Sequence, residues 1–164
     1  YKAIAGVSKM QHKEAAEVAP FLERYADEKN LSTLLRLVEA KADERTFMKY
    51  LVPGGKISAP SWKAMFAMGD ISKILEKASP KLPLASAIER YKKTKKISGI
   101  EVELSQDSAK RSLRKFRHAS LSLGVIVSAL LLKEQEVANV RKMVRSKALG
   151  LPESEIRSMM VLVK

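Results

Sequence analysis

The chain has 164 residues, and 31 Lys and Arg against 18 Asp and Glu give it a formal net charge of +13. A chain of this length can bury a core without covalent cross-links, and its lack of Cys excludes disulfide and thiolate chemistry. A positive charge of this size favours anionic partners, such as nucleic acid, acidic lipid or an acidic protein surface.

Good helix formers dominate the sequence, which therefore predicts an all-α fold. In the first half we expect helices at 1–10, 12–41, 44–51, 60–68 and 70–79. The second of these is expected to be kinked or split at Pro20, because proline removes a helical hydrogen bond. Asp43 and Asp70 are the expected N-caps of the helices that follow them. The Pro-rich stretch PKLP at 80–83 predicts a boundary between two helical repeat units, residues 1–82 and 83–164.

In the second half we expect a helix at 84–93, a basic loop at 92–99 and a long helix from 107 or 108 to 149. ISGIEVEL at 97–104 is the only plausible strand. Gly150 suits a left-handed C-cap, and Pro152 is placed to start a last helix that continues to about residue 163. The most apolar stretch, LSLGVIVSALLL at 121–132, is much shorter than the roughly 20 apolar residues of a membrane-spanning helix, and it predicts a buried helix.

Part of the first half returns in the second half, where 136–161 corresponds to 27–52, and this predicts an internal repeat. An acid, an Asn and an Arg recur with the same spacing, as Asp27, Asn30 and Arg36 and again as Glu136, Asn139 and Arg145. Helical spacing places each acid and Asn at the edge of an apolar face, which in the second copy contains Val137, Val140, Val144 and Ala148. An Asn at such an edge can fix how one helix meets another, by bonding to a backbone group or to the adjacent acid. These six polar residues are our candidates for helix junctions or for direct contact with a partner.

No motif predicts a catalytic, cofactor or metal site. VPGG at 52–55 lacks the spacing of a phosphate-binding loop although Lys56 follows it, so a turn that ends a helix is expected. The chain has only two His, His12 and His118, and no HExxH motif, so a zinc site is not expected. No paired carboxylates and no Ser/His/Asp constellation can be identified, and the chain is therefore expected not to be an enzyme.

Basic residues gather in RYKKTKK at 90–96 and AKRSLRKFRH at 109–118. The candidate basic contact face consists of Lys92, Lys93, Lys95, Lys96, Lys110, Arg114 and Arg117. This face could be simply solvated, or it could contact acidic protein or lipid head groups, or nucleic acid. A basic helical nucleic-acid-binding module is the alternative function, although aromatic residues make up only 5% and no recognition motif is present.

LLLKEQEVANVRKMVRSKALGLPESEIRSMMV at 130–161 resembles the closing helix pair of the C subunit of archaeal-type (A-type, V/A-type) ATP synthases, the counterpart of the vacuolar ATPase d subunit. The matching positions are Lys133, Glu134, Glu136, Val137, Asn139, Val140, Arg145, Lys147, Ala148, Gly150, Leu151, Pro152 and Glu155. Two further patches resemble the same family in the same order: 29–36 with 50–58, and 88–101 with 122–125.

This resemblance implies the C-terminal half of a non-catalytic adaptor, built from related helical units in a pseudo-threefold funnel. Such an adaptor is peripheral to the membrane, on its cytoplasmic face, and couples the ion-carrying proteolipid ring to the D and F subunits of the central stalk. It binds no nucleotide and no cofactor. Because the chain starts at Tyr1 inside an expected helix, we expect a fragment or processed chain, and a fragment of this kind is expected to self-associate through exposed apolar surface.

Overall fold

The computed structural model describes residues 13–118 and 122–162, and in these ranges it is all-α, as predicted. The helices in these ranges are α2 (Lys13–Glu39), α3 (Glu44–Tyr50), α4 (Ala59–Ala67), α5 (Ile71–Ala78), α6 (Ala85–Thr94), α7 (Ile97–His118), α8 (Leu123–Ala148) and α9 (Glu153–Met159). The helix expected at 1–10 lies outside the described residues.

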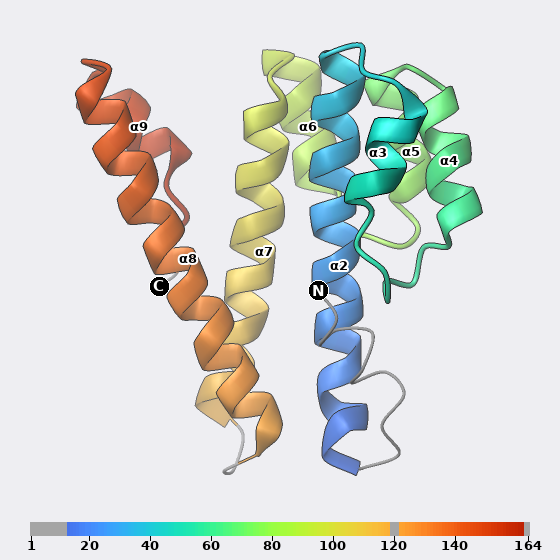
Figure 1. The fold of residues 1–164 in the computed structure, drawn as a ribbon. Helices are drawn as coiled ribbons and strands as arrows, with labels where there is room; N and C mark the ends of the chain where they lie inside the picture. The colour runs from blue at the N-terminus through green and yellow to red at the C-terminus, as the bar shows by residue number, and fades with distance from the viewer. Residues whose placement is uncertain (1–12, 119–121, 163–164) are drawn as a thin grey trace.

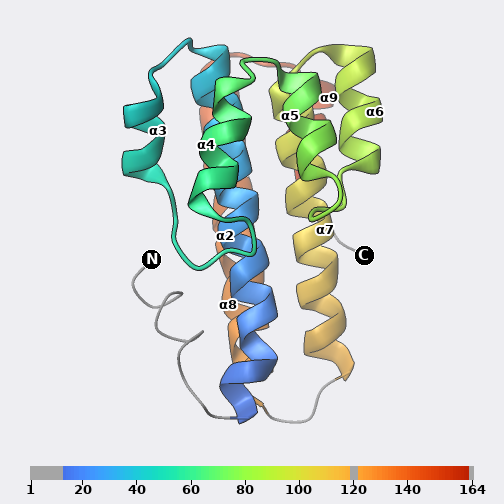
Figure 2. The ribbon, with the colours of Figure 1, turned by 90° about the vertical axis from the view of Figure 1, so that its right-hand side faces the viewer.

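Three long helices, α2, α7 and α8, lie side by side and form the body of the molecule (Figure 1). The helices α2 and α8 run in the same direction, and α7 runs antiparallel to both. The short helices α3, α4 and α5 cover α2 on the side away from α8, while α9 is the only one of the described short helices that packs beside α8 (Figures 1 and 2). The two sides of the body are therefore covered unequally.

The main core lies between α2 and the short helices. Leu31, Leu34 and Leu35 of α2 are fully buried there. Phe47 of α3 stacks on Phe66 of α4, with ring centroids 5.6 Å apart. Burial of each large apolar side chain of this kind contributes about 1.5–3 kcal/mol. The same cluster continues through Trp62, Met65, Ile74, Leu75, Leu82, Leu84, Ile97, Ile100 and Leu104.

The predicted helix ends are largely confirmed. The carboxylate of Asp43 accepts a hydrogen bond from the backbone N–H of Thr46 at 2.6 Å, and that of Asp70 accepts from Lys73 N–H at 2.9 Å. Both bonds satisfy N–H groups that the first turn of a helix leaves free. Gly150 has a φ of +69°, as expected for a left-handed C-cap. Of the two alternatives expected at Pro20, a kink or a split, the split is wrong because α2 continues through this residue.

Residues 97–104 are not a strand but the first turns of α7. Ile97, Ile100 and Leu104 are buried at helical spacing, so packing against the core outweighs the β-propensity of this stretch. The basic loop expected at 92–99 is also wrong. It shrinks to Lys95 and Lys96, because α6 reaches Thr94 and α7 begins at Ile97.

The single long helix expected from residue 107 or 108 to 149 is wrong, because the chain reverses between α7 and α8. Ser122 is extended, with φ −142° and ψ 161°, and α8 begins at the next residue. No proline marks this reversal, which is consistent with its being set by the antiparallel packing of the two helices. The last helix also stops earlier than expected, at Met159, where Met160 turns extended with φ −79° and ψ 145°.

The internal repeat is visible in the backbone. The helices α2 and α3 end at Glu39 and Tyr50, and α8 and α9 end at the corresponding positions of the second copy, Ala148 and Met159. The turn between each pair is also equivalent: Ala42 N–H donates to Leu37 O at 2.9 Å, and Leu151 N–H to Ser146 O at 3.0 Å. The structure therefore confirms the repeat, whereas its division into units 1–82 and 83–164 stays a prediction.

Burial differs between the two copies. The stretch at 121–132 is helical from Leu123 onward, but Ile126 and Leu130 are exposed, so the expectation that it is a buried helix is partly wrong. The apolar stripe of Val137, Val140 and Val144, expected to be packed, is exposed as well. Nothing among the described residues covers this outer face of α8.

Candidate functional site

The first junction is built on Asn30, which is buried in α2. Its side-chain amide donates to Val52 O at 2.9 Å, and its oxygen accepts from Val52 N–H at 2.7 Å. This pair of hydrogen bonds ties the segment after α3 to α2, in the way that the sequence predicted for an Asn at the edge of an apolar face. Because both groups of Val52 are satisfied by one side chain, the contact fixes register as well as distance.

Asp27, one turn before Asn30, holds the turn that follows. Its carboxylate accepts from the backbone N–H groups of Lys56 at 2.8 Å and Ile57 at 3.2 Å. Burial raises the pKa of Asp27, and the two backbone hydrogen bonds oppose that rise. Gly55 allows this close approach, because a Cβ added there would lie 2.7 Å from Asp27 Cγ.

The second junction repeats the first at Asn139. Its amide donates to Val161 O at 2.8 Å and its oxygen accepts from Val161 N–H at 3.1 Å, so Val161 is held as Val52 is held in the first copy. The acid is not repeated in the same way. Glu136 is exposed and pairs with Lys133 at 2.7 Å, whereas its counterpart Asp27 is buried. The two Asn are therefore equivalent joints, and the two acids are not.

The two Arg candidates also differ. The guanidinium of Arg36 donates to Glu101 of α7, with a distance of 2.8 Å from Nη2 to Oε2, and Ser32 donates to the same carboxylate. Burial raises the pKa of Glu101, but these hydrogen bonds outweigh it and leave the pKa below its ordinary value. Arg145 is exposed and has no ion pair with any described residue.

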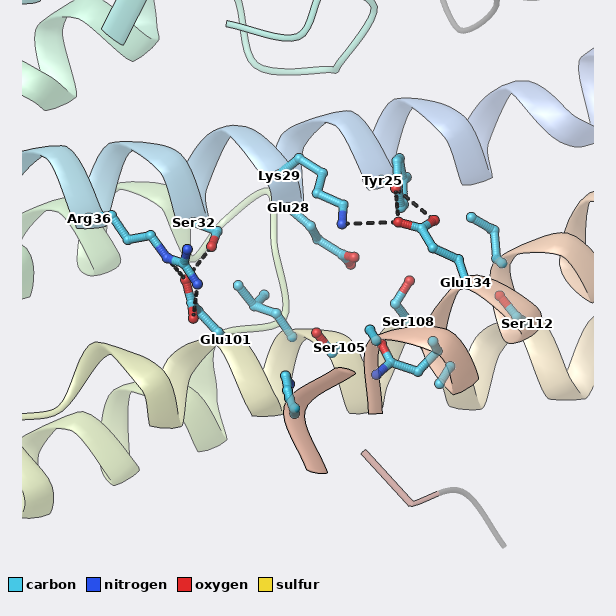
Figure 3. Close-up of a pocket in the computed structure, with 16 residues that line it drawn as sticks. Tyr25, Glu28, Lys29, Ser32, Arg36, Glu101, Ser105, Ser108, Ser112 and Glu134 are labelled. Atoms are coloured by element: carbon cyan, nitrogen blue, oxygen red, sulfur yellow. Dashed lines mark hydrogen bonds and ion pairs between the residues drawn. The ribbon is translucent and has the colours of Figure 1, made fainter. Parts of the chain in front are cut away.

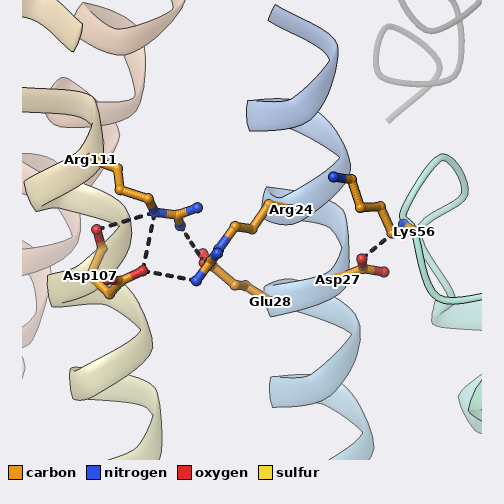
Figure 4. Close-up of polar contacts among 6 residues, drawn as sticks. All are labelled: Arg24, Asp27, Glu28, Lys56, Asp107 and Arg111. Carbon is orange, nitrogen blue, oxygen red and sulfur yellow. Dashed lines mark hydrogen bonds and ion pairs between the residues drawn. The ribbon is translucent and has the colours of Figure 1, made fainter. Parts of the chain in front are cut away.

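A four-residue ion network that the sequence analysis missed joins α2 to α7 (Figure 4). Glu28 accepts from Arg24 at 3.2 Å and from Arg111 at 2.6 Å, and Asp107 pairs with the same two guanidiniums at 3.0 and 3.1 Å. Burial raises the pKa of Glu28 and lowers that of Arg111. The sequence shows two oppositely charged pairs at a spacing of four, Arg24 with Glu28 and Asp107 with Arg111. It does not show that the two pairs contact each other.

A polar cavity of about 230 Å³ lies between α2, α7 and α8 (Figure 3). The Tyr25 hydroxyl donates to Glu134 of α8 at 2.7 Å, and Lys29 pairs with the same carboxylate at 3.3 Å. Lys142 donates to Met159 O at 3.2 Å, and burial lowers its pKa. The contacts of Glu134 join α2 to α8 across the cavity, and the Lys142 contact joins α8 to the end of α9.

The cavity offers no arrangement that predicts catalysis. Its Ser105, Ser108 and Ser112 have no His beside them among the lining residues. Across the part of the chain that the structure describes, no group of three or more His, Cys, Asp and Glu could hold a metal ion. What the arrangement can do chemically is to join helices through paired charges and amide hydrogen bonds.

The seven residues of the candidate basic contact face are all exposed, but they do not form one face. Lys92, Lys93, Lys95 and Lys96 lie where α6 ends and α7 begins. Lys110, Arg114 and Arg117 lie toward the other end of α7, and at 1.5 Å per residue about 20–30 Å separates the two groups. A second cavity, of about 600 Å³, gathers Arg24, Lys56, Lys81, Arg111, Arg114 and Lys115 near the latter group.

Comparison with known proteins identifies the family. The family model described as ATP synthase (C/AC39) subunit matches residues 1–159, nearly the whole chain. The chain belongs to this family of ATP synthase subunits. In the described helices, no stretch is long and apolar enough to cross a bilayer.

The C subunits of three A-type ATP synthases are similar to this chain. That of Methanococcoides burtonii is 30% identical over 154 residues, which are 87% of this chain and 40% of the relative. That of Methanocaldococcus jannaschii is 26% identical over 145 residues, 86% of this chain and 36% of the relative. That of Archaeoglobus fulgidus is 24% identical over an alignment of 176 residues, which covers 96% of this chain and 48% of the relative. The chain thus spans less than half the length of these relatives, and no solved structure matches it significantly.

Proposed function

We propose that this chain is part of a non-catalytic adaptor that couples the ion-carrying proteolipid ring of a rotary A/V-type ATP synthase to its central shaft. Membership of the family of ATP synthase C subunits supports this role. The observation that carries it is the pair of Asn joints, Asn30 with Val52 and Asn139 with Val161, in equivalent places of a repeated helix pair. An element that transmits torque needs helices that keep their register under load, and joints of this kind fix register.

The partners in this proposal are the proteolipid ring on one side and the D and F subunits of the stalk on the other. The adaptor is peripheral to the membrane, on the cytoplasmic face, and its related units, here 1–82 and 83–164, form part of a pseudo-threefold funnel. The separation of the basic residues supports contact with two bodies. One group lies around Lys93 and the other around Arg117, at opposite ends of α7.

Site-specific cross-linking tests the proposal directly, because the chain has no Cys of its own. Lys93→Cys places a thiol in the last turn of α6, next to the start of α7, and Arg117→Cys places one at the other end of α7. After reaction with a photoactivatable reagent, each variant is mixed with the purified proteolipid ring in detergent and, separately, with the purified complex of D and F. We expect one position to cross-link to the ring and the other to D or F.

A matched control is Lys63→Cys, an exposed position of α4, which lies on the side of α2 away from α8. Cross-links from the control at the same yield would mean that contact is unspecific and would contradict the proposal. So would binding to RNA or DNA that weakens by powers of ten over a few-fold increase in salt, which is the behaviour of a basic nucleic-acid-binding module.

A further inference from the structure

The cavity of about 600 Å³ beside α2 and α7, called the basic cavity from here on, is built by four segments of the chain. Arg24 comes from α2, Lys56 from the segment after α3 and Lys81 from the segment after α5, and α7 adds three more basic residues. Pro20 and Phe21 of α2 give the cavity an apolar part. Small-molecule sites typically have volumes of about 300–1,000 Å³ and combine apolar walls with a few polar groups, so the basic cavity has the size and lining of such a site.

The described lining of the basic cavity contains six basic residues but only one acid, Asp27. That carboxylate is already bonded, because it accepts from the backbone N–H groups of Lys56 at 2.8 Å and Ile57 at 3.2 Å. Lys81 and Arg114 are exposed, and neither forms an ion pair with a residue whose side chain the structure describes. The lining is therefore strongly positive, and its field favours an anion.

Two of the lining guanidiniums are fixed in position and still have donors to offer (Figure 4). Arg24 donates to Glu28 through Nε at 3.2 Å and to Asp107 through Nη2 at 3.0 Å. Arg111 donates to Glu28 through Nη2 at 2.6 Å, and its Nε pairs with Asp107 at 3.1 Å. A guanidinium has five N–H groups, so the Nη1 donors of both side chains remain available to a ligand. Donors that are held in advance lose little conformational freedom on binding, which favours affinity.

We propose that the basic cavity binds the phosphoryl group of an organic phosphate, with Lys81, Arg114 and the fixed guanidiniums around the anion and Phe21 beside the organic part. Donors that converge from several segments suit an anion with several oxygens, and the planar fork of Arg matches phosphate oxygens. The proposal does not rest on the adaptor role, because it follows from the lining of the cavity alone.

A nucleic-acid strand fits the basic cavity less well. A strand needs positive charge along an extended track, whereas the other basic group, around Lys93, lies about 20–30 Å away at the opposite end of α7. Phe21 is the only aromatic side chain in the described lining, which gives successive bases no series of rings to stack on. The lining therefore favours a compact phosphate over a polymer.

Two double variants with the same change of net charge test the proposal. Lys81→Gln with Arg114→Gln removes two positive charges from the basic cavity. Lys77→Gln with Lys93→Gln removes two at positions outside its lining, and all four side chains are exposed, so both variants are expected to fold. Each protein is titrated with inorganic tripolyphosphate in a calorimeter at constant ionic strength, which keeps general screening equal.

We expect the unchanged chain to bind one tripolyphosphate saturably. Loss of two charged donors should weaken binding by about tenfold or more in the variant of Lys81 and Arg114. The variant of Lys77 and Lys93 should bind as the unchanged chain does. Absence of saturable binding to the unchanged chain would overturn the proposal. Equal weakening in both double variants would overturn it as well, because it would report attraction to the overall charge instead of a site.

Brief acetylation of the unchanged chain, followed by mass spectrometry, locates the site without any variant. At a tripolyphosphate concentration about ten times Kd only about a tenth of the sites is empty, so Lys56 and Lys81 should react up to about tenfold more slowly. Lys77 and Lys93, outside the lining, should keep their rates. Slowing at all four lysines, or at none of them, would overturn the proposal.

Vesicles distinguish the two sources of a phosphoryl group, a soluble molecule and a lipid head group. The chain and both double variants are sedimented with vesicles of phosphatidylcholine that contain phosphatidic acid, whose head group is a phosphate monoester. Sedimentation that is lost only with Lys81→Gln and Arg114→Gln would support the proposal with a lipid as the source. Tripolyphosphate binding without sedimentation would support it with a soluble phosphate as the source.

Discussion

Residues 13–52 and residues 122–161 are two copies of one design, and their comparison separates what is set locally from what is set by neighbours. Helix ends, the turn between the helices and the Asn joint recur at one constant offset along the chain. Burial does not recur, because α4 and α5 cover only the first copy. Hydrogen bonds of the backbone and of the Asn side chains thus preserve the geometry of the repeat even where the apolar face remains open to solvent.

The largest expected difference between the copies is in the apolar face. Leu34→Ala should lower the free energy of unfolding by about 3 kcal/mol, because it opens a cavity in a packed core. Met143→Ala, at the equivalent position of α8, should lower it by less than about 1 kcal/mol, because Met143 is already half in solvent. Urea denaturation followed by circular dichroism measures both. Equal losses would mean that the face of α8 is covered in solution.

The Asn joints should differ less. Asn30→Ala leaves the buried N–H and carbonyl of Val52 without partners, which should cost about 2 kcal/mol. Asn139→Ala affects an equivalent but only half-buried pair, and about 1 kcal/mol is expected. Hydrogen exchange at Val52 and Val161 should show faster exchange at the affected residue in each variant. Faster exchange at both sites in one variant would argue against independent joints.

Arg36 and Arg145 should differ in how much their replacement changes stability at different pH. Because the pKa of Glu101 is lowered in the folded chain, its ion pair with Arg36 adds stability above the ordinary carboxyl range, and this is lost as pH falls through the folded pKa. Arg36→Ala should therefore destabilise by about 1 kcal/mol at pH 7 and by less in acid. Arg145→Ala should have no such effect. Unfolding curves between pH 3 and pH 7 would reveal it, and a pH-independent loss would contradict the assignment.

A further difference between the copies is expected in the turns. Lys41 and Gly150 occupy equivalent left-handed positions, with φ of +52° and +69°. Gly150→Ala should destabilise by about 1 kcal/mol, because a side chain there is strained, whereas Lys41→Gly should stabilise slightly, by about 0.5 kcal/mol. Thermal unfolding of the two variants should shift in opposite directions. A shift in the same direction would mean that the turns are not equivalent.

Much of this architecture follows from local patterns in the sequence. The caps at Asp43 and Asp70 and the left-handed Gly150 could be predicted because each depends on one side chain and the nearest turn. The repeat and its Asn residues could be found because the two copies keep the same spacing of acid, Asn and Arg although few of their residues are identical. The partner of Asn30 could be expected only as a backbone group or the adjacent acid. The structure was required to show that it is the backbone of Val52, 22 residues on.

What the sequence did not predict depends on distant neighbours. The reversal after His118 interrupts a run of good helix formers, and it is consistent with the packing of α7 against α8. Apolar and polar residues alternate in part of 97–104 as they do in a strand, yet these residues form the first turns of α7 and pack against the core as a helix. The ion network of Arg24, Glu28, Asp107 and Arg111 arises between segments far apart in the chain, and pairwise spacing within one helix cannot reveal it.

Both joints are made by an uncharged amide, although the chain around them is dense in Lys and Arg. An amide has no proton to gain or lose near neutral pH, and its hydrogen bonds are hardly screened by dissolved ions. Contacts between α2 and α7 that depend on carboxylates will weaken with acid or salt, whereas the Asn30 and Asn139 joints will not. Acid or salt can therefore weaken the packing of α2 against α7 while the angle within each helix pair, α2 with α3 and α8 with α9, stays fixed.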